Sequence, residues 1–170
     1  ITANTFGASN LKLEGSGYTS DEVIKAGIGL AKQAIARVCG TDGSGRKAYA
    51  AMDISSTGRL LKPLGTMEFD EAYEIFKDMA VSGEKAGADL VIIETMSDTY
   101  ELKAAVLAVK ENTSLPLFVT VTFDEKGKLL TGADVGAVVT LIEGLGADVI
   151  GINCGLGPVQ MRPLVQQMLE

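Results

Sequence analysis

An eleven-residue pattern occurs twice in this sequence, 59 positions apart, and it constrains the fold more than any other feature. Residues 85–95 read KAGADLVIIET and residues 144–154 read GLGADVIGINC. Each copy has a Gly-Ala-Asp turn, an apolar run that predicts a buried strand, and a polar pair at the end of that run. Continuous apolar strands are typical of a parallel sheet that is covered by helices.

Strands and helices are expected to alternate along the chain. The expected strands cover residues 47–53, 90–94, 115–123 and 147–153, the last of them fully buried, and residues 1–7 are interpreted as the end of an earlier strand with its turn. Helices are expected at residues 21–38, 69–85, from 98 onward, 134–145 and toward Glu170. Pro163 should lie in the first turn of the last helix or just before it. Residues 43–45 are interpreted as a solvated turn rather than a phosphate-binding loop.

This alternation predicts an α/β fold of about five βα units. A doubly wound sheet could also be built from five βα units. A (β/α)8 barrel of the TIM type fits better, because such barrels run to about 250 residues and these 170 residues begin inside a strand and stop in or after a helix. We therefore expect residues 1–170 to form a single domain, the central part of a barrel whose flanking strands are missing at both ends.

Composition excludes several classes of function. The net charge of −7 makes a nucleic-acid backbone a poor partner. No apolar run has the length to span a membrane, and no signal peptide opens the chain, so neither a membrane nor secretion is expected. Two distant cysteines predict no disulfide framework and favour the cytoplasm. The absence of histidine excludes Ser–His and Cys–His pairs and histidine-ligated metals within these residues.

Polar residues follow most of the expected strands. The strand ends of a parallel barrel meet on one rim, so we expect convergence of Asn4, Thr5, Asp53, Glu94, Thr95, Thr122, Asp124, Asn153 and Cys154. A thiol, carboxylates and amides suit an amino-acid ligand, whose ammonium group a carboxylate can hold. Glu94 directly follows an apolar strand and is costly to bury unless it is paired, which favours ligand contact. For the aspartates, capping of a helix or turn is the simpler interpretation, and the threonines could be ordinary turn residues.

Cys154 stands at the expected end of the last strand, where a Gly-rich loop turns the chain. Ligands of parallel α/β proteins bind at the carboxyl ends of strands, so this thiol can be presented to a ligand. A small buried hydrophobe is the other interpretation of a lone cysteine. Cys39, near a helix end, is assigned no role.

Several segments, taken in order, resemble the homocysteine S-methyltransferase family, and within it the cobalamin-dependent members. The similarity spans essentially all 170 residues. It rests on Asn4-Thr5-Phe6, the strand that ends in Glu94-Thr95, residues 98–105, Thr131-Gly132 and above all Gly151-Ile152-Asn153-Cys154.

The resemblance implies a methyltransferase that binds homocysteine and one zinc ion, the latter through three cysteine thiolates. Cys154 would be one of these, and the other two are expected as a Cys-Cys pair outside this sequence. Zinc would lower the pKa of the homocysteine thiol, and the thiolate would take a methyl group to give methionine. The expected donor is methylcobalamin, remethylated from methyltetrahydrofolate on other modules. Substrate contacts are expected from Asn4, Thr5, Phe6, Asp53, Glu94 and Asn153, with Glu94 holding the ammonium group.

Other functions stay open on the sequence alone. Within the family, betaine or S-methylmethionine could be the donor. A phosphate-binding barrel enzyme is a second possibility, with Gly155-x-Gly157 as a weak anion loop, and an inactive barrel fragment is a third. One thiolate cannot build a tetrahedral zinc site, so these residues alone are expected to be inactive. Their uncovered sheet edges suggest a homo-oligomer.

Overall fold

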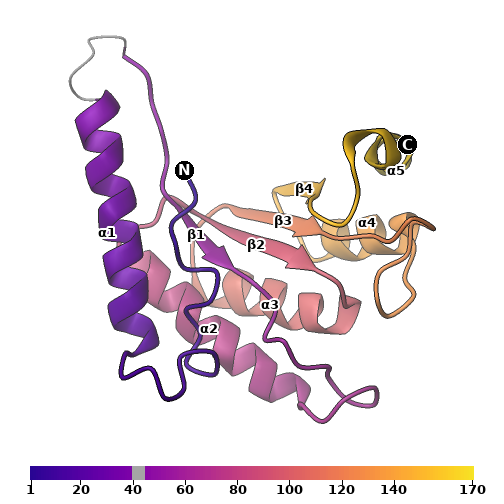
Figure 1. Cartoon of the computed structure of the whole chain (residues 1–170), viewed down its shortest axis with the longest axis horizontal. Helices are drawn as coiled ribbons and strands as arrows, with labels where there is room; N and C mark the ends of the chain where they lie inside the picture. Colours follow the sequence, from indigo (N-terminus) through magenta and orange to yellow (C-terminus); the bar gives the residue numbers. More distant parts are fainter. Residues whose placement is uncertain (40–44) are drawn as a thin grey trace.

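The computed structural model describes residues 1–39 and 45–170. The turn expected at residues 43–45 lies outside the described residues, apart from Gly45. Helices and strands alternate as predicted (Figure 1), in the order α1 Ser20–Cys39, β1 Ala51–Ile54, α2 Phe69–Lys85, β2 Leu90–Met96, α3 Thr99–Asn112, β3 Leu117–Val121, α4 Val135–Gly144, β4 Val149–Ile152 and α5 Pro158–Met168.

The strands form one parallel sheet in the order β1-β2-β3-β4. The first residues add to it, because Thr2 forms a parallel bridge with Ala51, and the amide of Ala3 donates to the carbonyl of Ala51 at 2.9 Å. Figure 1 shows α2, α3 and α4 along one face of this sheet. Consecutive parallel strands with their helices on one side are the arc of a (β/α)8 barrel. The expected fold class, an incomplete piece of such a barrel, is confirmed.

The core lies between this sheet and its helices. Phe76 of α2, Met52 of β1 and Leu102 of α3 are fully buried. Helix α2 approaches β1 closely at Gly83, where an added Cβ would lie 2.8 Å from the Cγ of Met52. This close contact sets the position of β1 relative to α2.

The repeated Gly-Ala-Asp turns have the same structural role. Asp89 donates its amide to the carbonyl of Ala50 at 2.8 Å, and its carboxylate accepts from the amide of Ala50 at 2.7 Å. Asp148 makes the same two bonds with Leu117, both at 2.8 Å. Each aspartate therefore locks the start of its own strand to the preceding strand, which sets the strand register.

Two expectations about the C-terminal part are wrong. The last strand is not fully buried, since Val149 is 43% exposed. The reason is that β4 is an edge strand among the described residues and pairs only with β3. Pro163 lies inside α5 rather than in its first turn, because Pro158 starts the helix, where its missing N–H is tolerated.

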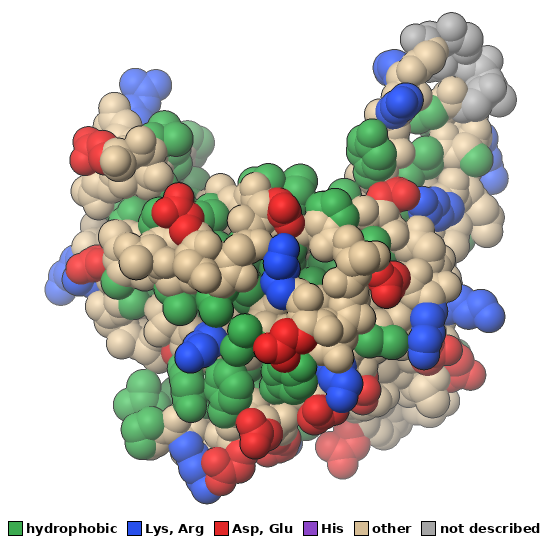
Figure 2. Space-filling model, turned by 180° about the vertical axis from the view of Figure 1, so that it is seen from behind, with side chains coloured by type: hydrophobic (Ala, Val, Ile, Leu, Met, Phe, Trp, Pro, Cys, Tyr) green, Lys and Arg blue, Asp and Glu red, His purple; other side chains and the backbone are tan. Residues whose placement is uncertain are grey.

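The two margins of the arc are uncovered. Figure 2 shows a broad hollow between the end formed by α5 and the end formed by α1, with hydrophobic side chains exposed across it. On α1, Leu30 is 66% exposed, and it borders a mainly apolar groove with Val23 and Ala26.

Within the described ranges, no helix combines the length and the apolar character needed to cross a bilayer.

Candidate functional site

Thr5 joins the N-terminal segment to the end of β1. Its hydroxyl donates to the carbonyl of Asp53 and accepts from the amide of Asp53, both at 2.9 Å. The Thr5 side chain is buried, so these two bonds use its hydroxyl inside the protein. The hydroxyl orients Asp53, and direct contact of Thr5 with a substrate stays a prediction.

Two acidic side chains from adjacent strands meet at this end of the sheet. Asp53 lies in β1, and Glu94 lies in β2 where the register with β3 is interrupted. Burial raises the pKa of Asp53 to about 7, and the nearby charge of Glu94 and a hydrogen bond with it act in the same direction. A second negative charge beside Glu94 is unfavourable, so Asp53 takes up a proton more readily than an isolated aspartate does. The Oδ1 atom of Asp53 is buried without a partner, which leaves it available to an added donor such as an ammonium group.

The last residue of each repeated pattern has an unusual backbone conformation. Thr95 has a φ of 60° and Cys154 a φ of 55°, and within residues 1–39 and 45–170 no other non-glycine residue has a positive φ. This left-handed conformation is disfavoured for residues with a Cβ and is found preferentially at functional sites. The two residues occupy equivalent positions in the two copies of the pattern, so the second copy reproduces the backbone bend of the first.

These two bends bring Thr95 and Cys154 into contact across the end of β3. The Thr95 Oγ1 lies 3.8 Å from the Cys154 Sγ. The amide nitrogen of Asn153 donates to Thr95 Oγ1 at 2.6 Å and to Cys154 Sγ at 3.4 Å, while its Oδ1 is buried without a partner. The Cys154 side chain is exposed. The thiol is therefore presented at the rim, as the sequence predicts, and is not packed among aliphatic side chains.

A hollow of about 450 Å³ opens beside Cys154 and is lined by residues that follow β2, β3 and β4. Gly155, on its wall, has a φ of +66°, and an added Cβ would lie 2.8 Å from Thr122 Oγ1 and 2.9 Å from the carbonyl oxygen of Phe123. Close packing therefore requires this glycine. The carbonyl oxygen beside it would repel an anion, which argues against the phosphate-loop interpretation of Gly155-x-Gly157.

The other two predicted residues of the N-terminal segment lie at the surface. Asn4 is exposed and lines the apolar groove on α1. Phe6 is 42% exposed, and the ammonium group of Lys12 lies 5.4 Å from the centre of its ring. The roles of Asn4 and Phe6 in substrate binding stay predictions.

Two charged residues near the rim were not predicted from the sequence. Lys12 donates to the hydroxyl of Ser55 at 2.8 Å, and burial lowers the pKa of its ammonium group. Glu101, which is 4% exposed, accepts from the amide and the hydroxyl of Thr57, both at 2.6 Å. Burial raises the pKa of Glu101. No local pattern marks either residue, because both bind a loop that is distant in the sequence.

The rim offers one thiol ligand for a metal ion. Among the residues that the structure describes, no group of three or more histidine, cysteine or acidic side chains could hold a metal together. Cys154 suits the role of a single ligand, because its thiol is exposed and receives hydrogen-bond donors. The described residues do not form a complete metal site by themselves.

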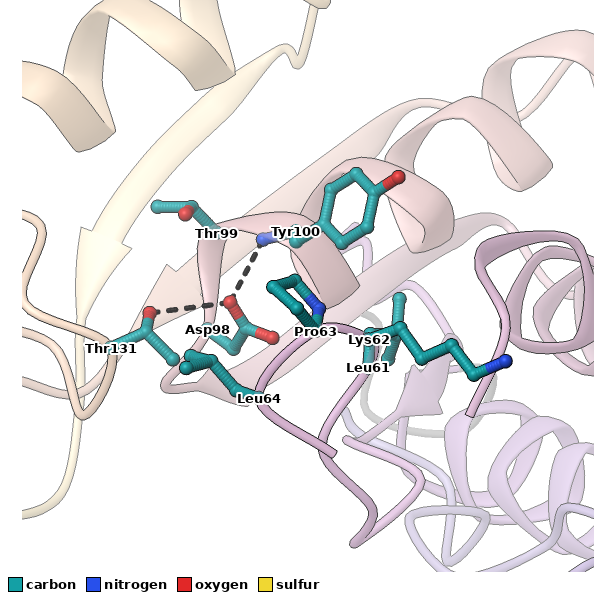
Figure 3. Close-up of a pocket in the computed structure, with 8 residues that line it drawn as sticks. All are labelled: Leu61, Lys62, Pro63, Leu64, Asp98, Thr99, Tyr100 and Thr131. Carbon is teal, nitrogen blue, oxygen red and sulfur yellow. Dashed lines mark hydrogen bonds between the residues drawn. The ribbon is translucent and has the colours of Figure 1, made fainter. Parts of the chain in front are cut away.

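A separate hollow of about 380 Å³ lies outside this cluster, between the loop after β1 and the start of α3 (Figure 3). Asp98 lines it and accepts hydrogen bonds from the amide of Tyr100 at 3.0 Å and the hydroxyl of Thr131 at 3.2 Å. Asp98 therefore caps α3 and tethers the loop after β3. None of the predicted substrate contacts lines this hollow.

Comparison with known proteins gives a consistent result. The sequence model of the family described as homocysteine S-methyltransferase matches residues 1–170. A methionine synthase of Mycobacterium tuberculosis is 31% identical over 169 residues, which are 95% of this chain and 14% of that protein. A methionine synthase of Mycobacterium leprae is 37% identical over 109 residues, 61% of this chain and 9% of that protein. The chain thus spans only a small part of these relatives.

Solved structures share the fold. The metallated form of the homocysteine methyltransferase MmuM from Escherichia coli superposes with a TM-score of 0.85, covering 98% of this chain and 61% of that one, at 16% identity. Its apo form gives a TM-score of 0.76 over 88% of this chain and 54% of that one, at 19% identity. At these identities the likeness extends to the fold alone.

Proposed function

Because this chain belongs to the homocysteine S-methyltransferase family, we propose that it is the central part of a (β/α)8 barrel that binds homocysteine for methylation of its sulfur. The observation that carries the proposal is the placement of an exposed thiol and two carboxyl groups at one end of a parallel sheet. Cys154 contacts Thr95, the residue that directly follows Glu94, and Glu94 lies close enough to Asp53 to raise its pKa. Sulfur chemistry and amino-group recognition therefore lie side by side.

Glu94 and Asp53 hold the substrate ammonium group in this proposal. The unpartnered Oδ1 of Asp53 supplies an acceptor that no described residue satisfies. An ammonium group between the two carboxyl groups stabilises their charged forms, so it offsets the burial that otherwise keeps Asp53 protonated. Asn153 and the Asn4-Thr5-Phe6 segment complete the walls, with Thr5 acting through Asp53.

Cys154 is the residue of this chain that would hold zinc, together with two cysteines from outside these residues. Zinc bound there would lower the pKa of a coordinated thiol, so that homocysteine reacts as a thiolate at neutral pH. The protein's own contribution is to present the Cys154 sulfur at the rim. Asp53 and Glu94 orient the amino end of the substrate so that its sulfur reaches the same place.

The methyl donor and the partner modules form the finer part of the proposal. Similarity to two methionine synthases supports a cobalamin-dependent reaction with methyltetrahydrofolate as the methyl source, carried by other modules of a longer polypeptide. The hollow beside Cys154 provides an open approach for such a donor. We place this reaction in the cytoplasm, and the uncovered margins of the arc are expected to be covered by the remaining barrel strands or by a second copy.

The test is substitution of Cys154 by serine in the full-length protein, with Cys39→Ser as the matched control. Cys39 lies half-buried at the end of α1, far along the chain from the site. Cys154→Ser is expected to abolish stoichiometric zinc, measured by elemental analysis, and to abolish methyl transfer without loss of the fold. Glu94→Gln is expected to retain zinc but to raise the dissociation constant of homocysteine about tenfold or more, because a charge-assisted bond is lost.

Cys39→Ser should behave as the wild-type protein in both measurements. Normal zinc content and normal homocysteine binding in Cys154→Ser would show that this thiol is not a metal ligand. The proposed function would then be wrong.

A further inference from the structure

The amide group of Asn153 uses both of its hydrogens at the rim. One N–H points to the Thr95 hydroxyl at 2.6 Å and the other to the Cys154 sulfur at 3.4 Å, a normal distance for a hydrogen bond to sulfur. An amide nitrogen carries two donors and no acceptor. This arrangement therefore commits the donor end of Asn153 to its two neighbours and leaves Oδ1 as its remaining polar atom.

The hydroxyl of Thr95 extends the same chain of donors. Because Thr95 Oγ1 accepts from Asn153, its own hydrogen is free to be donated, and the nearest sulfur is that of Cys154 at 3.8 Å. Thr95 is held in place from its other side, since its amide donates to Thr120 Oγ1 at 3.3 Å. The sulfur is thus approached by an N–H and by an O–H that the same amide polarises.

The opposite orientation of the amide would not suit a thiolate. A rotation of the Asn153 amide by 180° would place its oxygen against the sulfur, and two electron-rich atoms would then face each other. A thiolate accepts hydrogen bonds and donates none, so only donors stabilise it. A Cys154 sulfur that binds a metal as a thiolate would therefore favour the amide orientation that the structure shows.

We propose that Asn153 and Thr95 are positioning residues for the Cys154 thiolate, donating hydrogen bonds to its sulfur and thereby tuning its strength as a metal ligand. The inference rests on the proposed function, in which Cys154 holds zinc. The left-handed backbone at both Thr95 and Cys154 is the structural means, because it turns the two side chains toward each other across the end of β3. Asn153 thereby acquires a role on the metal-ligand side of the pocket in addition to lining it.

Such donors matter because of charge. Three cysteine thiolates exceed the charge of a zinc ion, and a substrate thiolate adds a further negative charge. Hydrogen bonds to a ligand sulfur disperse part of this excess and fix the direction of the sulfur lone pairs. Loss of partners of this kind commonly weakens metal binding by about 10- to 100-fold.

The experiment measures zinc affinity in the full-length protein by competition with a chromophoric chelator. Asn153→Asp, which turns a donor into a charged acceptor, is expected to weaken zinc binding by about 10- to 100-fold. Thr95→Val, which has the same shape but no hydroxyl, is expected to weaken it by about tenfold. Thr95→Ser should restore the wild-type value.

A spectroscopic measurement separates an effect on the sulfur from a general loss of structure. In the cobalt-substituted proteins, the sulfur-to-cobalt charge-transfer band of Asn153→Asp and Thr95→Val should move to lower energy, because a thiolate with fewer hydrogen bonds is easier to oxidise. Thr140→Val is the matched control, since Thr140 lies exposed on α4 and its hydroxyl donates to the carbonyl of Gly136 within the same helix. It should leave both the affinity and the band unchanged.

The inference is overturned if Asn153→Asp and Thr95→Val bind zinc as the wild-type protein does and show an unshifted band while Cys154→Ser loses the metal. That result would leave the proposed function standing. Zinc binding that survives Cys154→Ser, or a wild-type protein that binds no zinc, would overturn both. If Asn153→Asp does not fold, the comparison of Thr95→Val with Thr95→Ser decides the question.

Discussion

Replacing Asp53 with asparagine is expected to stabilise the barrel domain at neutral and alkaline pH while weakening homocysteine binding. Asp53 is 5% exposed, and its Oδ1 has no hydrogen-bond partner. Burial, with the charge and the hydrogen bond of Glu94, raises its pKa from 3.8 to about 7. Asparagine has the same shape without the charge, and its NH2 can donate a hydrogen bond to Glu94.

The direction of the pH dependence follows from proton binding. A carboxyl group with a raised pKa in the folded state binds more protons when folded than when unfolded, over the range between the two pKa values. The free energy of unfolding therefore falls as the pH rises from 3.8 to about 7, and Asp53 causes no further change outside that range. The range covers roughly three pH units, and each unit changes the free energy of unfolding by about 1.36 kcal/mol. At pH 8 the ionised Asp53 therefore lowers the free energy of unfolding by at most about 4 kcal/mol.

The assay is guanidinium unfolding of the polypeptide that carries the complete barrel, at pH 4, 6 and 8. Asp53→Asn should match the wild-type protein at the lowest pH and exceed it increasingly toward pH 8, by up to about 4 kcal/mol. Asp78→Asn, at an exposed position of α2, serves as the control for the change of residue type. The dissociation constant of homocysteine should rise in Asp53→Asn, because one acceptor for the ammonium group loses its charge. An Asp53→Asn protein that is no more stable than the wild type at pH 8, or whose advantage does not depend on pH, would refute the reasoning.

Two further substitutions test the scaffold around the site. Gly155→Ala should lower the melting temperature and weaken zinc binding, because a Cβ there would lie 2.8 Å from Thr122 Oγ1 on a backbone with a φ of +66°; unchanged melting and metal affinity would contradict the packing seen at the end of β4. Phe76→Ala should cost about 3–5 kcal/mol of unfolding free energy, since this fully buried side chain fills the core between α2 and the sheet. Denaturant titration measures that loss, and a value below about 1 kcal/mol would contradict the core packing.

Much of the architecture could be predicted from local patterns. Helix α2 begins and ends where its periodicity indicates, at Phe69 and Lys85. The repeated Gly-Ala-Asp turns mark the starts of β2 and β4. In both copies the aspartate makes the same two hydrogen bonds to the preceding strand. The local pattern also marks β4 as an apolar strand, but the exposure of β4 depends on its neighbours, and among the described residues it pairs only with β3.

The candidate site was likewise predictable only in part from the sequence. The sequence by itself determined that a thiol and a carboxylate follow two apolar strands, because apolar runs and the turns after them consist of consecutive residues. Only the tertiary structure decided that Asp53 is buried beside Glu94 and that Asn153 and Thr95 face the sulfur of Cys154. The physical reason is that these contacts depend on strand register and on two left-handed backbone residues. Both properties arise from the packing of the whole sheet and not from any short stretch of the chain.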